Sequence, residues 1–378
     1  MAPHLWRHPG TFDDVLSLAD VDRALTGTGL RRPAFRLVRD GDAIPPGRYT
    51  RSARTGRSQI DDLIDPGRVL DLFADGATIV LQGLQRWWEP AARFCRDLEL
   101  ALGHPLQANA YLTPPGAAGL APHHDTHDVF VLQVAGTKHW VVREPMLDIP
   151  LPRHVSDHGA AAARPVLFEA DLAEGDALYL PRGVVHSATA QEGVSLHLTL
   201  GVLATTTHDV LRAVLDAAAD DVAFRRSLPP GWPYDDDLAG RAVKGIVADL
   251  VDWLGRLDPA TVAATLRDRF VANRTPVLDG QLHEVLALGT VADATVVRRR
   301  AATILHLARD GDALRLTLGD REVVLPAPLE PAVRRLTDGA PHRVGDLADL
   351  LDGPSRLVLA RRLIREGALR TGGPGGDG

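Results

Sequence analysis

The sequence has almost no cysteine and no long apolar run. It contains one cysteine in 378 residues, Cys95, so no disulfide can form within the chain and we expect a reducing, cytoplasmic location. No apolar run reaches the roughly 18 residues that a membrane helix needs, and the first residues lack the basic-then-apolar order of a secretory signal. We therefore expect neither a disulfide framework nor a membrane partner.

Lysine is almost absent as well. Only Lys138 and Lys244 are lysines among the 42 basic residues, and the net charge is −7. An acidic chain of this kind is not expected to have general affinity for nucleic acid or anionic lipid. Because arginine stands almost everywhere else, the lysine at position 138 is a mild indication that an amine is needed there.

The hydrophobic pattern predicts a mixed α+β fold around an all-β central domain. Residues 1–75 are expected to hold short helical pieces, and helical spacing predicts a helix over Glu89–Leu102. Many short strands separated by turn residues are typical of a sandwich or barrel, including the jelly roll of cupins. Strands are predicted over Ala77–Gln82, Ala108–Thr113, Asp128–Val134, His139–Val142, Ala177–Leu180 and Ser195–Val202.

After about residue 206 the pattern becomes helical. Helices are predicted over Asp209–Val222 and Arg241–Leu257, and a third begins near Pro259. Further on, Gly319-Asp320 joins two short alternating runs as a hairpin. Helices near Val344–Leu351 and Ser355–Arg365 beside this hairpin indicate a winged-helix-like module.

The segment from His123 to Asp128 reads His-His-Asp-Thr-His-Asp. In a strand, residues i and i+2 face the same side, so His123 and Asp125 can point to one place while His124 points away. His186 follows a predicted strand and turn, and can approach the same place from a neighbouring strand. Two imidazoles and one carboxylate on one side of a metal form the facial triad of non-haem Fe(II) oxygenases.

A zinc hydrolase is the alternative metal enzyme, because two histidines and an acid also bind catalytic zinc. Its usual helical His-Glu-x-x-His motif does not occur in the chain. His139, His154 and His158 have no comparable spacing, and we expect them to be surface or packing residues.

Four blocks of sequence together resemble the JmjC/cupin-like ribosomal oxygenases. The longest is Gly-Leu-Ala-Pro-His-His-Asp-Thr-His-Asp-Val-Phe-Val-Leu-Gln-Val-Ala-Gly-Thr-Lys-His-Trp over residues 119–140. The others are Asn-Ala-Tyr-Leu-Thr-Pro-Pro from Asn109, Leu-Pro-Arg-Gly-Val-Val-His up to His186, and Ser-Leu-His-Leu-Thr from Ser195. The resemblance runs in order from about residue 77 to residue 200, and implies a double-stranded β-helix that binds Fe(II) and 2-oxoglutarate.

Position by position, the resemblance implies that His123, Asp125 and His186 are the iron ligands. It places Lys138 where a basic residue binds the distal carboxylate of 2-oxoglutarate, and a buried anion needs such a cation. Asn109 matches a position that hydrogen-bonds this co-substrate, and His197 matches a histidine of the pocket, although a packed core histidine fits that position equally well. The chain departs from several relatives at Gly201, where they carry a hydroxyl residue.

The hydrophobic pattern and the resemblance together imply a domain plan. A JmjC/cupin catalytic domain over 1–205 precedes a helical, dimerising region over 206–275, a winged-helix-like domain over 276–370 and a disordered tail over 371–378. We therefore expect a homodimeric 2-oxoglutarate-dependent dioxygenase that uses O2 to hydroxylate a side chain of a protein, foremost a ribosomal protein.

Two other functions fit the same residues. The first is the same chemistry on a peptide natural product or a small molecule, because substrate choice depends on loops that the sequence does not define. The second is a non-catalytic, cupin-type ligand sensor with a winged helix. Several arginines between Arg356 and Arg370 could contact DNA, but residues 276–378 hold as many acidic as basic side chains, which favours packing or protein recognition.

Overall fold

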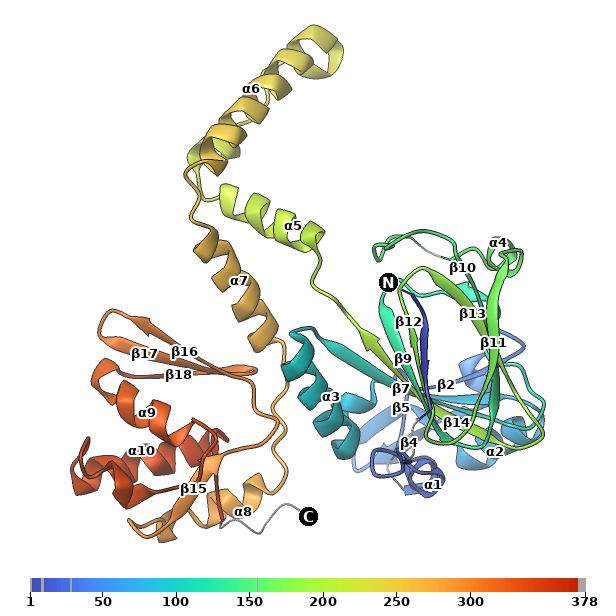
Figure 1. Cartoon of the computed structure of the whole chain (residues 1–378), viewed down its shortest axis with the longest axis horizontal. Helices are drawn as coiled ribbons and strands as arrows, with labels where there is room; N and C mark the ends of the chain where they lie inside the picture. The colour runs from blue at the N-terminus through green and yellow to red at the C-terminus, as the bar shows by residue number, and fades with distance from the viewer. Residues whose placement is uncertain (1, 8–9, 28, 155, 373–378) are drawn as a thin grey trace. The chain divides into compact units, whose positions relative to one another are not determined.

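The computed structural model describes residues 2–7, 10–27, 29–154 and 156–372. The chain divides into two compact units, residues 1–204 and residues 205–378. Figure 1 shows the first unit as the β-rich body that carries the N-terminus and the second as the helical and β segments that end at the C-terminus.

Two antiparallel sheets form the body of the first unit. The larger sheet has eight strands in the order β1-β12-β9-β14-β7-β6-β2-β3. Its strands are β1 (His4–Trp6), β2 (Phe35–Arg39), β3 (Asp42–Ala43), β6 (Thr78–Gln82), β7 (Leu106–Thr113), β9 (Asp128–Ala135), β12 (Ala177–Leu180) and β14 (Ser195–Val202). The smaller sheet has the order β11-β10-β13-β8. Its strands are β8 (His123–His124), β10 (Lys138–Pro145), β11 (Val166–Leu172) and β13 (Val184–Ala190).

The alternation of apolar residues along these strands buries one face of each sheet against the other. Val131 of β9 and Leu178 of β12 share a buried cluster with Trp140 and Val142 of β10 and Leu172 of β11. This is the packing of a double-stranded β-helix, in which period-2 side chains from both sheets fill the interior. The site described below opens within this interior.

Helices cover the other face of the larger sheet. They are α1 (Leu18–Gly27), α2 (Pro66–Ala74) and α3 (Glu89–Leu102), and a fourth helix, α4 (His158–Ala162), follows β10. Leu25, Leu72 and Cys95 of α1, α2 and α3 pack in one buried cluster with Ile79 and Leu198 of the sheet. A separate hairpin joins β4 (Thr50–Thr55) to β5 (Ser58–Ile64).

The first 75 residues differ from the expected series of short helical pieces. They contain five strands, β1 to β5, beside the helices α1 and α2. Strands β1 and β2 are held by pairing with β12 and β6 rather than by their own weak alternation, so tertiary pairing overrides the local pattern. The predicted helix over Glu89–Leu102 and the predicted strands over Ala177–Leu180 and Ser195–Val202 are confirmed.

The second unit begins with three helices, α5 (Thr207–Ala218), α6 (Asp236–Leu254) and α7 (Pro259–Ala272). It continues with α8 (Gln281–Leu286), β15 (Val296–Arg299), β16 (Leu305–Asp310), β17 (Ala313–Leu318), β18 (Arg321–Pro326), α9 (Glu330–Leu336), β19 (His342–Arg343), α10 (Gly353–Arg365) and β20 (Leu369–Thr371). The strands form two sheets, β19-β15-β20 and β16-β17-β18. The predicted hairpin across Gly319-Asp320 is confirmed as β17 and β18.

Two expectations for this unit need correction. The helix predicted over Val344–Leu351 is a single 3-10 turn, Val344–Leu347. Thr371 belongs to β20 instead of a disordered tail, because its backbone N–H and hydroxyl donate to the carboxylate of Glu284. The remainder of that expected tail, from residue 373, lies outside the described residues.

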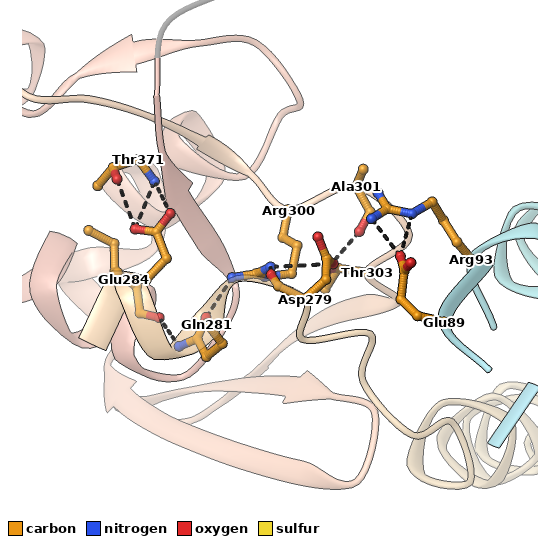
Figure 2. Close-up of polar contacts among 10 residues, drawn as sticks. Glu89, Arg93, Asp279, Gln281, Glu284, Arg300, Ala301, Thr303 and Thr371 are labelled. Atoms are coloured by element: carbon orange, nitrogen blue, oxygen red, sulfur yellow. Dashed lines mark hydrogen bonds and ion pairs between the residues drawn. The ribbon is translucent and has the colours of Figure 1, made fainter. Parts of the chain in front are cut away.

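A buried arginine ties α8 to the sheet of β15. Arg300 is 3% exposed, and its guanidinium donates to the Asp279 carbonyl at 2.6 Å and to Gln281 Oε1 at 2.5 Å. Gln281 in turn donates to the Ile364 carbonyl of α10 at 2.8 Å. Figure 2 shows Arg300 with Asp279 and Gln281, beside the Glu284–Thr371 contact.

Candidate active site

His123, Asp125 and His186 converge between the two sheets of the first unit. One ligand atom from each of the three lies within 4.8 Å of the others. His123 of β8 and His186 of β13 are direct antiparallel partners, with ring centroids 4.5 Å apart. Asp125 follows β8, and its Oδ2 lies 3.6 Å from Nε2 of His186. The structure therefore brings together the three residues that the sequence grouped.

Backbone carbonyls orient both imidazoles. Nδ1 of His123 lies 2.8 Å from the Ala121 carbonyl, and Nδ1 of His186 lies 3.2 Å from the Val184 carbonyl. Each ring therefore donates from Nδ1, which leaves Nε2 as the nitrogen that can face a metal. Burial and the neighbouring His123 lower the pKa of His186 to about 4, so its ring is neutral at pH 7.

A glycine fixes the backbone beside Asp125. The Gly183 N–H donates to the Asp125 carbonyl at 2.9 Å, and the Gly183 carbonyl accepts from the Met146 N–H at 3.0 Å. Gly183 has φ +89°, and a Cβ there would lie 2.1 Å from the Leu147 carbonyl oxygen. Only glycine fits this position, which ties the loop after β10 to the Asp125 segment.

The three residues line a cavity of about 250 Å³. Its walls come from both sheets, with side chains of β7, β9 and β14 on one side and of β8, β10 and β13 on the other. The sequence-predicted residues Lys138, Asn109 and His197 all line it. The cavity therefore places all six predicted site residues around one small space.

Lys138 is a buried cation in this cavity. It is 2% exposed, and its Nζ donates to the Thr113 hydroxyl at 3.0 Å. Burial lowers the pKa of Lys138 to about 7. Among the residues that the structure describes, no carboxylate forms an ion pair with it. An anionic ligand would supply the missing partner.

Asn109 and His197 are held by neighbours on the larger sheet. The side-chain oxygen of Asn109 accepts from the Gly83 N–H at 3.0 Å. His197 stacks on Tyr111 with ring centroids 5.0 Å apart and meets Trp140 edge-on at 5.5 Å. Burial holds the pKa of His197 well below its usual range, and its Nδ1 has no hydrogen-bond partner within the described residues.

Four further cavity residues were missed by the sequence reasoning: Arg36, Tyr111, His127 and Thr199. The Tyr111 hydroxyl is hydrogen-bonded to Arg36 and Thr199, while burial raises the pKa of Tyr111. Arg36 comes from β2, a strand that the sequence did not predict, so no local signal identified it. Tyr111 and Thr199 lie on predicted strands at cavity-facing alternation, which could have indicated them.

The other histidines of the region lie outside the triad. His124 points away from the triad, with its Nε2 3.2 Å from the His154 carbonyl. His158 Nδ1 lies 3.0 Å from the Pro122 carbonyl, and its ring centroid is 6.5 Å from that of His123. His139 binds Asp171 and Glu169 on the surface, as expected.

Comparison with known proteins places this geometry in a family. Residues 84–210 match the JmjC domain. The chain is 32% identical over 341 residues to ribosomal oxygenase 1 of Rattus norvegicus, which covers 82% of this chain and 50% of that protein. The chain belongs to the JmjC ribosomal oxygenase family. The resemblance stated from the sequence blocks is thus confirmed.

Other family members differ in the activity that their names state. The chain is 37% identical over 319 residues to the bifunctional lysine-specific demethylase and histidyl-hydroxylase NO66 of Brugia malayi, covering 75% of this chain and 44% of that protein. This chain therefore spans about half the length of the curated JmjC relatives that it matches.

Solved structures show the same fold. Escherichia coli ycfD superposes with a TM-score of 0.57 at 18% identity, covering 98% of this chain and 95% of that one. Escherichia coli ribosomal oxygenase YcfD in complex with cobalt and 2-oxoglutarate superposes with a TM-score of 0.52, also at 18% identity and with the same coverage. The JmjC, cupin-type fold of this chain is therefore established. No helix in the described part of the chain is long and apolar enough to cross a membrane.

Proposed function

We propose that this protein is an Fe(II)- and 2-oxoglutarate-dependent oxygenase that hydroxylates a side chain of a ribosomal protein. The observation that carries the proposal is the convergence of His123, Asp125 and His186 in the cavity that also holds the buried cation Lys138. A metal-ligand set and a site for an organic anion are the two requirements of this chemistry.

The donor set fits Fe(II). Two imidazoles and one carboxylate suit this metal, and all three residues line the cavity that would receive its other ligands. The carbonyls of Ala121 and Val184 hold the rings in the tautomer that binds a metal through Nε2. When bound, Fe(II) with 2-oxoglutarate supplies the activation of O2 that the hydroxylation of a C–H bond needs.

The cavity also fits 2-oxoglutarate. We assign the distal carboxylate of this co-substrate to Lys138, whose ammonium the Thr113 hydroxyl holds in place. Asn109 and His197 lie on the wall beside it, where Asn109 is fixed by Gly83 and His197 by its stacking on Tyr111. These side chains position the co-substrate and exclude water from it.

The names of the relatives support a ribosomal protein as the substrate. They include ribosomal oxygenases and a histidyl-hydroxylase, and several match over most of this chain. We place the protein in the cytoplasm, where ribosomes work, and the single buried cysteine, Cys95, suits a reducing compartment.

We further propose that the second unit contributes a dimer interface and a winged-helix-like protein-binding module. Helix α6 has no buried residue, and Val243, Ile246, Val247, Val251 and Leu254 expose one apolar stripe at helical spacing. An exposed stripe of this kind marks an interaction site, and a second copy of the helix is the partner that fits. We therefore place the limits between the catalytic domain, the dimerising helices and the winged-helix-like module at residues 205 and 275.

The arginines of α10 support protein recognition rather than DNA binding. Arg356 is paired with Asp293, Arg361 donates to the Val291 carbonyl at 2.8 Å, and Arg362 lies 2.8 Å from Glu366. These partners neutralise or occupy the guanidinium groups, so the helix does not present the free basic face that phosphate contacts need.

An anaerobic titration tests the enzyme proposal. Metal-free protein receives Fe(II) and then 2-oxoglutarate, and the visible charge-transfer band of a keto acid on iron is recorded. We expect a band that His123→Ala abolishes, Lys138→Ala weakens and the surface control His139→Ala leaves unchanged. Absence of the band in the iron-loaded protein would overturn the proposal in favour of another metal or of a ligand sensor.

Two further measurements test the substrate and the dimer. Mass spectrometry of ribosomal proteins from gene-deleted and parent cells should show one hydroxylation that depends on the gene. If none is lost, the substrate is a peptide natural product or a small molecule. Sedimentation should show a dimer that Val247→Glu dissociates and Ala248→Glu, outside the stripe, does not.

A further inference from the structure

Strand β14 presents alternate side chains to the cavity. His197, Thr199 and Gly201 all line it, as the period of two requires. Gly201 is the one position of the three without a side chain. It pairs with Gln107 of β7 and Val129 of β9, so it lies inside a central strand, where glycine is unfavourable.

The backbone does not explain this glycine. Gly201 is not among the described glycines with positive φ, so any residue could adopt its conformation. The space occupied by a neighbouring side chain explains the glycine instead. A Cβ at position 201 would lie 2.4 Å from both Cδ2 and Nε2 of His127. The imidazole of His127 therefore rests directly on the Gly201 backbone, in the place where a side chain would otherwise stand.

His127 and Lys138 belong to different ends of the cavity. Lys138 binds Thr113, which pairs with Ser195 at the start of β14, whereas His127 rests on Gly201 six residues later. His123, Asp125 and His186 line the same cavity as both of these residues.

The ring of His127 is available to a ligand. Within the described part of the chain no hydrogen bond to its nitrogens is present, although it lines the cavity with Asp125 and His186. A neutral imidazole always carries one N–H donor. A carboxylate that binds a metal through one oxygen has a second oxygen that accepts such a bond.

We propose that His127 donates a hydrogen bond to the keto-acid end of 2-oxoglutarate, and that Gly201 is present to make room for its ring. The proposal rests on the proposed function. Lys138 and His127 would then hold the two carboxylates of one dicarboxylate. His127 supplies the contact that the missing hydroxyl at position 201 would otherwise provide.

Affinity for 2-oxoglutarate tests this inference, with protein loaded with Co(II) so that no turnover occurs. We expect His127→Ala to weaken binding about tenfold, the value of one hydrogen bond to a charged group. His127→Gln, which retains a donor, should recover part of the loss. His139→Ala is the matched histidine control and should bind like the unsubstituted protein.

A second set of variants, built on Gly201→Ser, tests the same inference independently. The serine Cβ displaces the ring, so this variant should weaken binding in the presence of His127. In the double variant with His127→Ala, the serine should cause no further loss, because the ring that it displaces is absent. Additive losses would overturn the proposal, and so would unchanged affinity in His127→Ala. Thermal unfolding checks that each variant is folded.

The outcomes also separate this inference from the proposed function. If the unsubstituted protein and His139→Ala bind Co(II) but not 2-oxoglutarate, the proposed function fails. If both bind 2-oxoglutarate and His127→Ala binds it equally well, the role of His127 fails alone.

Discussion

The ammonium of Lys138 lies 3.0 Å from the hydroxyl oxygen of Thr113, which also accepts a hydrogen bond from the Thr78 hydroxyl at 3.2 Å. Both neighbours are neutral. Two strands of the larger sheet, β6 and β7, therefore position the cation without neutralising it, and its charge remains available for a ligand.

The first prediction concerns the number of protons that the protein takes up when 2-oxoglutarate binds. Burial lowers the pKa of Lys138 to about 7, so above this pH the amine of the free protein is mostly neutral. A carboxylate beside it favours the charged form, so binding of 2-oxoglutarate at pH 8.5 should take up about one proton, and at pH 6 almost none. Calorimetry in two buffers with different ionisation enthalpies measures this uptake. Equal uptake in Lys138→Met would contradict the assignment.

The second prediction separates two adjacent histidines. His123→Ala removes a ligand of the triad and should abolish the visible bands of bound Co(II), with a loss of affinity of at least about 100-fold. His124→Ala should retain these bands, because His124 points to the His154 carbonyl instead. Loss of the bands in both variants, with folding intact, would show that His124 belongs to the metal site.

The third prediction compares two glycines with nearly the same positive φ. Gly136 has φ +65° and Gly116 has φ +68°, but a Cβ at 136 would lie 1.9 Å from the Val194 carbonyl oxygen, whereas a Cβ at 116 meets nothing within 4 Å. Gly116→Ala should cost about 1–2 kcal/mol of unfolding free energy from strain alone. Gly136→Ala should cost clearly more, as measured by denaturant unfolding. Equal losses would mean that the strand ends shift easily.

The fourth prediction concerns the second unit. Arg300→Met removes the hydrogen bonds that a buried guanidinium donates to the Asp279 carbonyl and the Gln281 side chain, so we expect a loss of about 2–3 kcal/mol. Hydrogen exchange should report it as faster exchange in β15 and α10. Arg309→Met, at an exposed arginine, should change exchange by little. If the two variants behave alike, the network does not stabilise the unit.

Much of the site was predictable because its signals are local. The alternation of His123 and Asp125 is a property of an extended chain, and the blocks around Asn109, Lys138 and His186 occur in a characteristic order. The strands Ala177–Leu180 and Ser195–Val202 combine alternation with flanking turn residues, and the structure confirms both.

The remainder depends on contacts between distant segments. Arg36 reaches the cavity from β2, a strand that exists because it pairs with β6 and whose own pattern is ambiguous. His127 was grouped with its neighbours, and Gly201 was seen only as a missing hydroxyl. Their relation needs the register of β14 against β9, which no local pattern specifies.

The packing of the His127 ring against the Gly201 backbone also limits which substitutions this chain can accept. A side chain at position 201 should weaken 2-oxoglutarate binding while the His127 ring is present. It should cause no such loss once another residue has replaced His127. The effect of a substitution at position 201 thus depends on which residue stands at position 127. Descendants that carry a side chain at position 201 should therefore also have replaced His127.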